Sequence, residues 1–260
     1  FGSSACPPSS QYRGGSWNAP KTAAPKTSSG NMDDQDRLKC LAEVAEAAER
    51  YDDMFEYMTE RIGTNKPLSG EERELFAAAA KNALSGRRSC LRTMKAEFEV
   101  SDDASTAALA SGYSSKVMAE LQDICRKVLS SLGNILIPGT PESDVLTRTF
   151  YYKMMGDYNR YLAEVSDKDH LASVSQAAAD AYGAAMQAAE ALDPVDPVRM
   201  GLALNYSVFQ HEVLRNTQDA IAIATQTLQA AMNCGDPSQI QDQAATLQAL
   251  EDNLAQWGAA

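Results

Sequence analysis

The chain has 260 residues, a formal net charge of −12 and a sequence pI near 4.6, with 23 Lys and Arg against 35 Asp and Glu. Such an acidic balance disfavours general nucleic-acid binding, which requires a basic surface to replace the counterions of the phosphate backbone. The five cysteines are not spaced as CxxC pairs, which argues against a zinc site, and we expect neither a metal nor a cofactor.

The first predicted feature along the chain is a flexible extension over residues 1–33. Residues 1–31 contain four Pro, four Gly, seven Ser and two Thr, so this segment has too few apolar side chains to offset the entropy of ordering. We predict one folded domain over residues 34–260. No apolar run reaches the roughly 20 residues of a membrane helix, no signal-peptide stretch is visible, and the scattered cysteines suit free thiols. These features favour a cytoplasmic or nuclear protein without a membrane partner.

From Asp34 onward the composition predicts helices almost throughout, because Ala, Leu, Glu, Gln, Met and Lys dominate and β-branched alternation is scarce. Ser69 followed by Glu72 has the form of a capping box at a helix start. We expect an all-α fold of roughly nine helices, joined by short loops that favour antiparallel neighbours. Clusters of Pro and Gly mark the clearest breaks, at residues 63–67, 137–141, 193–197 and 234–237.

The helix predicted from Gly70 to about Lys95 carries three cations on one face. Lys81, Arg88 and Arg92 stand at i, i+7 and i+11, and at about 100° per residue they fall within about 40° of one another. Stacked cations repel, so they require a counter-anion. Spacing alone leaves two sources open. The anion is either a set of acids on a neighbouring helix or a phosphate, which arginine binds bidentately and lysine as a point charge.

The helix predicted from about Glu142 to Val165 has two different stripes. One stripe is apolar and is expected to face the core; its members are Tyr151, Met155, Tyr158, Leu162 and Val165. The other is polar and of mixed charge, with Lys153, Asp157, Arg160, Tyr161 and Glu164. For an arbitrary helix, spacing alone favours a solvated face for the second stripe.

Two later helices present asparagines. On the helix predicted from Pro197 to about Leu214, Asn205, Val208 and Glu212 share a face with Leu204 beside them. On the last helix, Asn253 and Trp257 stand at i and i+4. An asparagine amide offers both a donor and an acceptor, as a clamp on an extended peptide backbone requires. Spacing alone favours ordinary positions beside the core.

Five blocks of sequence, in this order, carry a family resemblance that runs from about Asp34 to Trp257. They are AEAAERYDDM at 45–54, KNALSGRRS at 81–89, FYYKMMGDYNRYLAEV at 150–165, PVRMGLALNYSVF at 197–209 and LEDNLAQW at 250–257. Together they resemble the 14-3-3 protein family. The resemblance implies nine antiparallel helices, a dimer that forms a cup, and a groove in each protomer for phosphoserine or phosphothreonine peptides. It implies an adaptor that regulates client proteins in signalling, not an enzyme.

The resemblance assigns roles to individual residues of this chain. Lys81, Arg88, Arg160 and Tyr161 match the family's phosphate ligands. Asn205 and Asn253 match the asparagines that hold the peptide backbone. The polar positions that line the groove are matched by Lys153, Asp157, Glu164 and Glu212. The positions of its apolar wall are matched by Leu204, Val208 and Trp257.

The resemblance also implies a dimer interface, as a homodimer or a heterodimer with a paralogue. Arg50 and Asp53 match positions that pair across the dimer with Glu120 and Lys116. An exposed ion pair of this kind is worth under about 1 kcal/mol, so burial of Val44, Ala48 and Tyr113 in the same interface is expected to supply more.

Two alternatives stay open at this stage. Ala249, Gln256 and Met155 depart from the family's usual residues near the groove. The first alternative is a TPR-like helical scaffold that binds unphosphorylated partners, which the alanine-rich segment 176–192 before a proline-rich turn would suit. An enzyme is disfavoured, because the chain has no GxGxxG, P-loop, HExxH or nucleophile-elbow motif.

Overall fold

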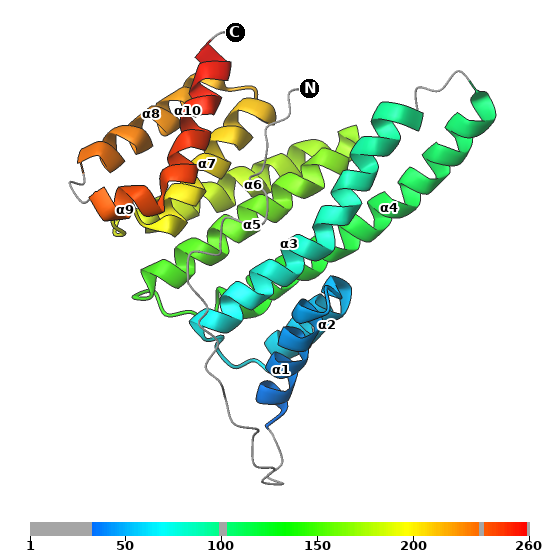
Figure 1. Ribbon diagram of the computed structural model, residues 1–260, viewed down its shortest axis with the longest axis horizontal. Coiled ribbons are helices and arrows are strands. Elements are labelled where there is room, and N and C mark those ends of the chain that lie inside the picture. Colours follow the sequence, from blue (N-terminus) through cyan, green and yellow to red (C-terminus); the bar gives the residue numbers. More distant parts are fainter. Residues whose placement is uncertain (1–32, 99–102, 234–236, 259–260) are drawn as a thin grey trace. The chain divides into compact units, whose positions relative to one another are not determined.

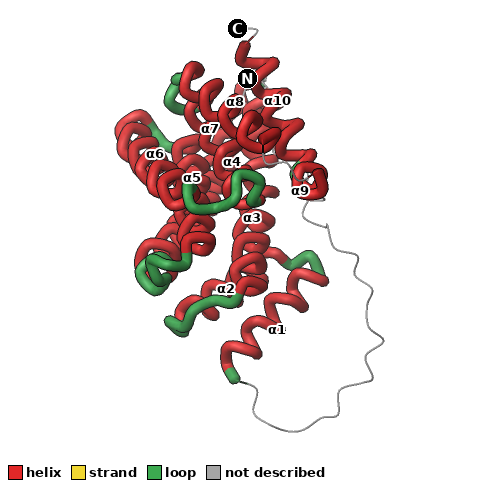
Figure 2. Tube along the Cα trace, turned by 90° about the vertical axis from the view of Figure 1, so that its left-hand side faces the viewer, coloured by secondary structure: helices red, strands yellow, loops and turns green. Residues whose placement is uncertain are grey.

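The computed structural model describes residues 33–98, 103–233 and 237–258, and all regular structure in these ranges is helical (Figures 1 and 2). The expected all-α fold class is confirmed. The predicted extension over residues 1–33 lies almost wholly outside the described residues and stays a prediction. In the described part of the chain, no helix is long and apolar enough to cross a membrane. The α-helices are α1 (Asp34–Ala47), α2 (Tyr51–Gly63), α3 (Gly70–Thr93), α4 (Ala104–Ser131), α5 (Val145–Val165), α6 (Lys168–Ala189), α7 (Pro197–Glu212), α8 (Thr217–Asn233), α9 (Pro237–Asp242) and α10 (Ala244–Gly258).

The described residues hold ten α-helices, one more than the nine expected, because a turn at Gln243 separates the short α9 from α10. The predicted breaks at residues 63–67, 137–141 and 193–197 lie at or between helix ends, and residues 234–236 of the fourth lie outside the described residues. Two α-helices continue into π-helical turns, Met94–Phe98 after α3 and Leu132–Leu136 after α4. In the second, the Ile137 N–H donates to the Leu132 carbonyl, five residues back, at 2.9 Å.

The helices form two compact units, Met32–Ala189 and Glu190–Ala260. In the first unit, α1 packs against α2, α3 lies beside α4, and α5 packs along α6 (Figure 1). Its core is continuous from α1 to α5; large members are Met54, Met58, Phe76, Leu121 and Leu132. This unit places α3 and α5, which carry the predicted phosphate ligands, on one framework.

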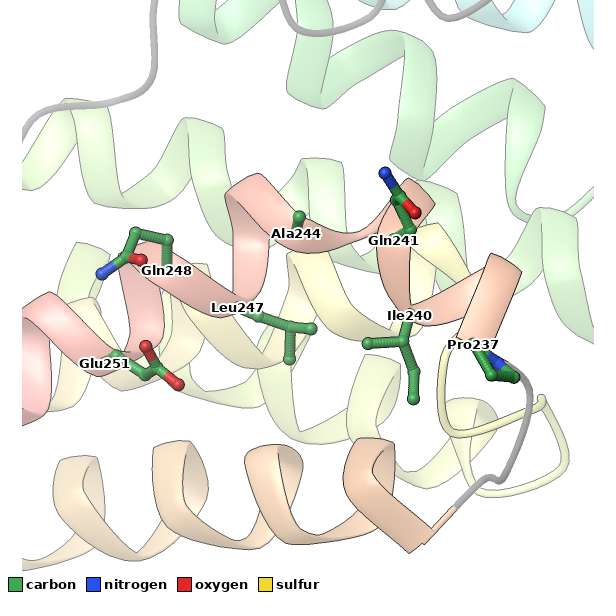
Figure 3. Close-up of a pocket in the computed structure, with 7 residues that line it drawn as sticks. All are labelled: Pro237, Ile240, Gln241, Ala244, Leu247, Gln248 and Glu251. Carbon is green, nitrogen blue, oxygen red and sulfur yellow. The ribbon is translucent and has the colours of Figure 1, made fainter.

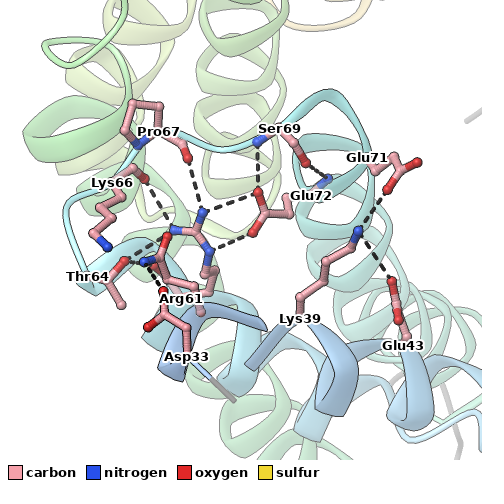
Figure 4. A network of polar contacts seen from close by, with 11 residues as sticks. Asp33, Lys39, Glu43, Arg61, Thr64, Lys66, Pro67, Ser69, Glu71 and Glu72 are labelled. Carbon is pink, nitrogen blue, oxygen red and sulfur yellow. Dashed lines mark hydrogen bonds and ion pairs between the residues drawn. The ribbon is translucent and has the colours of Figure 1, made fainter. Parts of the chain in front are cut away.

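The connection from α2 to α3 is closed by a buried arginine (Figure 4). The Arg61 side chain is about 4% exposed, and its Nε donates to Glu72 Oε1 at 2.6 Å. Its other nitrogens donate to the carbonyls of Lys66 and Pro67 at 3.3 and 3.1 Å. Glu72 also accepts from the Ser69 N–H at 2.8 Å, while the Ser69 hydroxyl accepts from the Glu72 N–H, so the predicted capping box is confirmed.

The second unit contains α7 to α10. Asp196 caps α7 by accepting from the N–H groups of Val198 and Arg199 at 2.8 and 3.2 Å, and Pro197 follows in the first turn, where its missing N–H costs nothing. One apolar cluster joins α8 and α10; its buried members are Ala220, Ala224, Leu228, Leu250 and Trp257.

Candidate functional site

The four predicted phosphate ligands lie on α3 and α5 of the first unit. The guanidinium carbons of Arg88 and Arg160 both lie over the Tyr161 ring, 4.3 and 4.7 Å from its centroid. Lys81 is exposed and stands two turns before Arg88 on α3. Thus Arg88 and Arg160, which are 72 positions apart in sequence and lie on two helices, meet at one aromatic ring.

Glu164 connects the two arginines. Arg88 Nη2 donates to Glu164 Oε1 at 2.8 Å, and Arg88 Nε donates to Oε2 at 3.1 Å. Arg160 Nη1 lies 3.3 Å from the same Oε1, one helical turn away on α5. An acid on a neighbouring helix therefore supplies a counter-anion for Arg88, which was one of the two sources that spacing left open.

Below this surface, a buried layer of polar groups supports Arg160. Asp157 is buried; its Oδ2 accepts from Lys153 Nζ at 2.9 Å and its Oδ1 from the Tyr182 hydroxyl at 2.6 Å. Burial alone would raise the pKa of Asp157, but Lys153, Arg160 and the Tyr182 hydrogen bond outweigh it and hold the pKa below the usual value. Asp157 is therefore an anion at neutral pH, held between a half-buried lysine and a buried tyrosine.

Tyr182 is the member of this layer that sequence reasoning missed. It lies on α6, within an alanine-rich segment that had suggested only a scaffold. The available signal was that Tyr182 is the only tyrosine, phenylalanine or tryptophan in α6. Burial and the neighbouring Asp157 carboxylate raise the pKa of Tyr182 well above its ordinary value, so the hydroxyl keeps its proton.

The other predicted peptide-binding residues belong to the second unit. Leu204 and Val208 on α7 pack, half-buried, against the α8–α10 cluster, and Trp257 is buried with its ring stacked on His211 at 5.0 Å between centroids. These three side chains therefore contribute to the core of their unit. Three polar positions are half-buried beside them: Asn205, Glu212 and Asn253.

The predicted dimer residues lie on α2, on α4 and around the end of α1. Val44 and Tyr113 are 60% and 52% exposed. Arg50 donates to Asp53 of its own chain, and Glu120 accepts from Arg87 Nε at 3.0 Å. Ala48 and Lys116 are exposed too, whereas Asp53 and Glu120 are half-buried. The pairing of these charges across a dimer stays a prediction.

A separate open groove lies in the second unit between α9 and α10 (Figure 3). Ile240 and Leu247 point into it, and the polar side chains of Gln241, Gln248 and Glu251 surround them. None of its lining residues is among the predicted site residues. In the described residues, no group of three or more His, Cys, Asp and Glu side chains is placed to hold a metal ion.

The chain brings two arginines together at a tyrosine and one carboxylate, an arrangement suited to binding an anion. Comparison with known proteins identifies its class. A sequence profile of the 14-3-3 protein family matches residues 41–258. The chain belongs to the 14-3-3 family.

Three relatives are similar over most of their length. The checkpoint signal transducer rad25 of Schizosaccharomyces pombe is 39% identical over 224 residues, covering 84% of this chain and 82% of the relative. Human 14-3-3 protein eta is 36% identical over 233 residues, covering 87% and 95%. The 14-3-3 protein homolog 1 of Schistosoma mansoni is 38% identical over 221 residues, covering 84% and 87%. As a 14-3-3 protein, the chain is an adaptor that binds phosphorylated client proteins and not an enzyme.

Proposed function

We propose that this adaptor binds the phosphate of phosphoserine and phosphothreonine clients through Lys81, Arg88, Arg160 and Tyr161. The observation that carries the proposal is the approach of Arg88 and Arg160 to one oxygen of Glu164, at 2.8 and 3.3 Å. Two guanidinium groups that share one carboxylate oxygen are close enough to share the oxygens of a phosphate. Arginine is suited to this because its planar fork matches phosphate geometry.

We further propose that polar and apolar side chains of both units bind the client peptide. Asn205 and Asn253 hold its backbone, because an amide can donate and accept at once. Leu204, Val208 and Trp257 offer apolar contacts. Four charged residues complete the set: Lys153, Asp157, Glu164 and Glu212. For Asp157, burial under Lys153 and Tyr182 favours an indirect contribution, through the residues that it orients.

Dimerisation is general in the 14-3-3 family, and we propose which residues of this chain form the interface. Val44, Ala48 and Tyr113 supply the exposed apolar surface, and Arg50, Asp53, Lys116 and Glu120 supply the charges. On dimerisation Arg50 would exchange its own Asp53 for Glu120 of the partner. Each exchange replaces one ion pair by another, so the apolar contacts are expected to provide most of the stability.

The partners we propose are Ser- and Thr-phosphorylated signalling proteins and a second 14-3-3 protomer, and the compartment is the cytoplasm or the nucleus. Cys40, Cys90 and Cys125 are free thiols, as a reducing compartment maintains. The net charge of −12 argues against nucleic acid as a partner.

The test is fluorescence anisotropy with a labelled Arg-Ser-x-phosphoSer-x-Pro peptide, its unphosphorylated twin and a twin with Glu in place of phosphoserine. The wild-type protein is expected to bind the phosphopeptide and to bind both twins far more weakly, because a glutamate has less charge and fewer acceptors than a phosphate. Each charge-assisted hydrogen bond that Arg88→Ala removes is worth about 1.5–3 kcal/mol, so the loss of even one corresponds to a fall of about 10- to 100-fold in affinity.

A matched control separates the pocket from general electrostatics. Arg126→Ala also removes one positive charge, from an exposed position on α4 where Arg126 contacts Gln122. Its phosphopeptide affinity should equal that of the wild type. Equal binding of the phosphopeptide and its unphosphorylated twin would refute the proposed pocket and favour recognition of unphosphorylated partners.

A further inference from the structure

Arg160 is a buried cation, and other groups have to fix the orientation of its guanidinium. Its side chain is 7% exposed, and its guanidinium has a plane that a phosphate must meet edge-on for a bidentate contact. Glu164 accepts a hydrogen bond from one nitrogen of this guanidinium, Nη1, at 3.3 Å. The Nε side of the guanidinium therefore requires a second group if the plane is to be held.

The Tyr182 hydroxyl is that second group. It lies 3.5 Å from Arg160 Nε and donates its own proton to Asp157 Oδ1 at 2.6 Å. Asp157 is in turn fixed by Lys153 on its other oxygen, at 2.9 Å. The Arg160–Tyr182 contact is long for a hydrogen bond. Its effect is therefore to restrict where the guanidinium can lie and to leave the terminal nitrogens for Glu164 or an anion.

The position of Tyr182 depends on a glycine in the facing helix. A Cβ atom added at Gly156 on α5 would lie 2.6, 2.7 and 2.8 Å from three ring carbons of Tyr182. Real Cβ contacts are not this short, so Gly156 is the residue that lets the ring lie against the α5 backbone. Gly156, Asp157 and Arg160 lie within about one turn of α5, and Tyr182 contacts all three.

We propose that Tyr182 is a positioning residue for the phosphate site, which holds the Arg160 guanidinium through a hydroxyl that Asp157 orients and Gly156 admits. The inference rests on the proposed phosphate-binding function, and it adds two residues, Tyr182 and Gly156, that touch no phosphate. Such preorganisation raises affinity because less side-chain freedom is lost on binding.

The test compares Tyr182→Phe with Tyr151→Phe. Tyr182→Phe deletes only the hydroxyl and keeps the ring packed against Gly156. Tyr151 is also a buried tyrosine and lies on α5, but it belongs to the core cluster of the first unit and, in the described structure, makes no hydrogen bond or ring contact with the proposed phosphate ligands. Phosphopeptide affinity is expected to fall about 3- to 10-fold in Tyr182→Phe, the range for one hydrogen bond of about 0.5–1.5 kcal/mol, and to stay unchanged in Tyr151→Phe.

A second readout measures Arg160 directly, without a ligand. In ¹⁵N NMR spectra of the free protein, the Arg160 Nε–Hε resonance should shift and its proton should exchange faster with solvent in Tyr182→Phe. If Tyr182 contributed only to folding, its substitution would lower the free energy of unfolding without a specific change in the Arg160 Nε–Hε resonance. Gly156→Ala keeps the hydroxyl but displaces the ring, and it should change the same resonance and weaken binding at least as much.

Each outcome decides the inference. An unchanged Arg160 resonance in Tyr182→Phe overturns it, whatever the peptide does. A changed resonance with unchanged affinity, while Arg88→Ala still weakens phosphopeptide binding, overturns the positioning role and leaves the phosphate site intact. Failure of the wild type to prefer the phosphopeptide refutes the proposed function, and the inference falls with it.

Discussion

Removal of the Arg61 side chain is expected to destabilise the first unit more than any exposed charge does. Arg61 and Glu72 form a buried ion pair, with side chains about 4% and 9% exposed. The guanidinium also closes the α2–α3 connection by donating to two carbonyls (Figure 4). Arg61→Ala leaves the Glu72 carboxylate buried with the Ser69 cap as its remaining partner.

The expected magnitude follows from that unpaired charge. Breaking a buried ion pair by removing one partner costs about 3–5 kcal/mol, whereas exposed pairs contribute about 0–1 kcal/mol. Urea unfolding followed by circular dichroism at a fixed protomer concentration should therefore show a free energy of unfolding about 3–5 kcal/mol lower for Arg61→Ala. Arg37→Ala, which breaks the exposed pair with Asp34, should lie within about 1 kcal/mol of the wild type.

A double substitution separates the charge from the packing. Arg61→Met with Glu72→Gln keeps an acceptor for the Ser69 N–H and leaves no charge buried, so it should be less destabilised than Arg61→Ala alone. If Arg61→Ala and Arg37→Ala lose equally little, the argument from a buried pair is wrong. If the double variant is less stable than Arg61→Ala, burial of an unpaired charge is not the cause of the loss.

Three further predictions concern acid, a helix cap and the cysteines. Burial would raise the pKa of Glu72, but its hydrogen bonds to the helix cap and to Arg61 outweigh burial and lower that pKa. The stability that the Glu72 carboxylate contributes is therefore present above about pH 4.5 and lost as the pH falls through the pKa of Glu72 in the folded protein. The difference in urea midpoint between wild type and Glu72→Gln should close in acid. Asp196→Ala should cost about 1 kcal/mol in the same unfolding assay, because α7 loses its N-cap, and no change would contradict the capping role. Burial raises the pKa of the Cys125 thiol to about 12, so at pH 8 iodoacetamide should modify exposed Cys40 in the folded protein and Cys125 only after unfolding, as read by mass spectrometry.

The helices and their ends could be predicted from local chemistry. Ser69 and Glu72 complete each other's hydrogen bonds within four residues, and Pro197 begins a helix where its missing N–H is harmless. These interactions need no distant partner, so the sequence contains them in full. The errors concerned helix boundaries: a turn at Gln243 separates α9 from α10, and α5 begins at Val145 rather than at Glu142.

The burial of the α5 charges could not be predicted from spacing. The polar stripe of α5 favoured a solvated face, yet Asp157 and Arg160 are 6% and 5% exposed. The cause is α6, whose alanines Ala178, Ala181 and Ala185 are buried and take up little space, so the two helices pack closely along their length. Which helix covers a face is decided by contacts between distant segments, and spacing within one helix does not contain that information.

Spacing left two counter-anions open for the cationic stripe, an acid on a neighbouring helix or a phosphate, and the two are compatible with one another. Arg88 and Arg160 bring two positive charges to the Tyr161 ring in the proposed site, and Glu164 returns one negative charge to them. The two arginines therefore keep an excess of about one positive charge, and the proposed approach of Lys81 would add a second toward a phosphate that carries about −1.5 to −2 near neutral pH. Glu164 thus satisfies the arginines in the free protein without neutralising them. A client carboxylate, with a single charge, would leave that excess uncompensated, and so the same acid that pairs with Arg88 helps to select phosphate over glutamate.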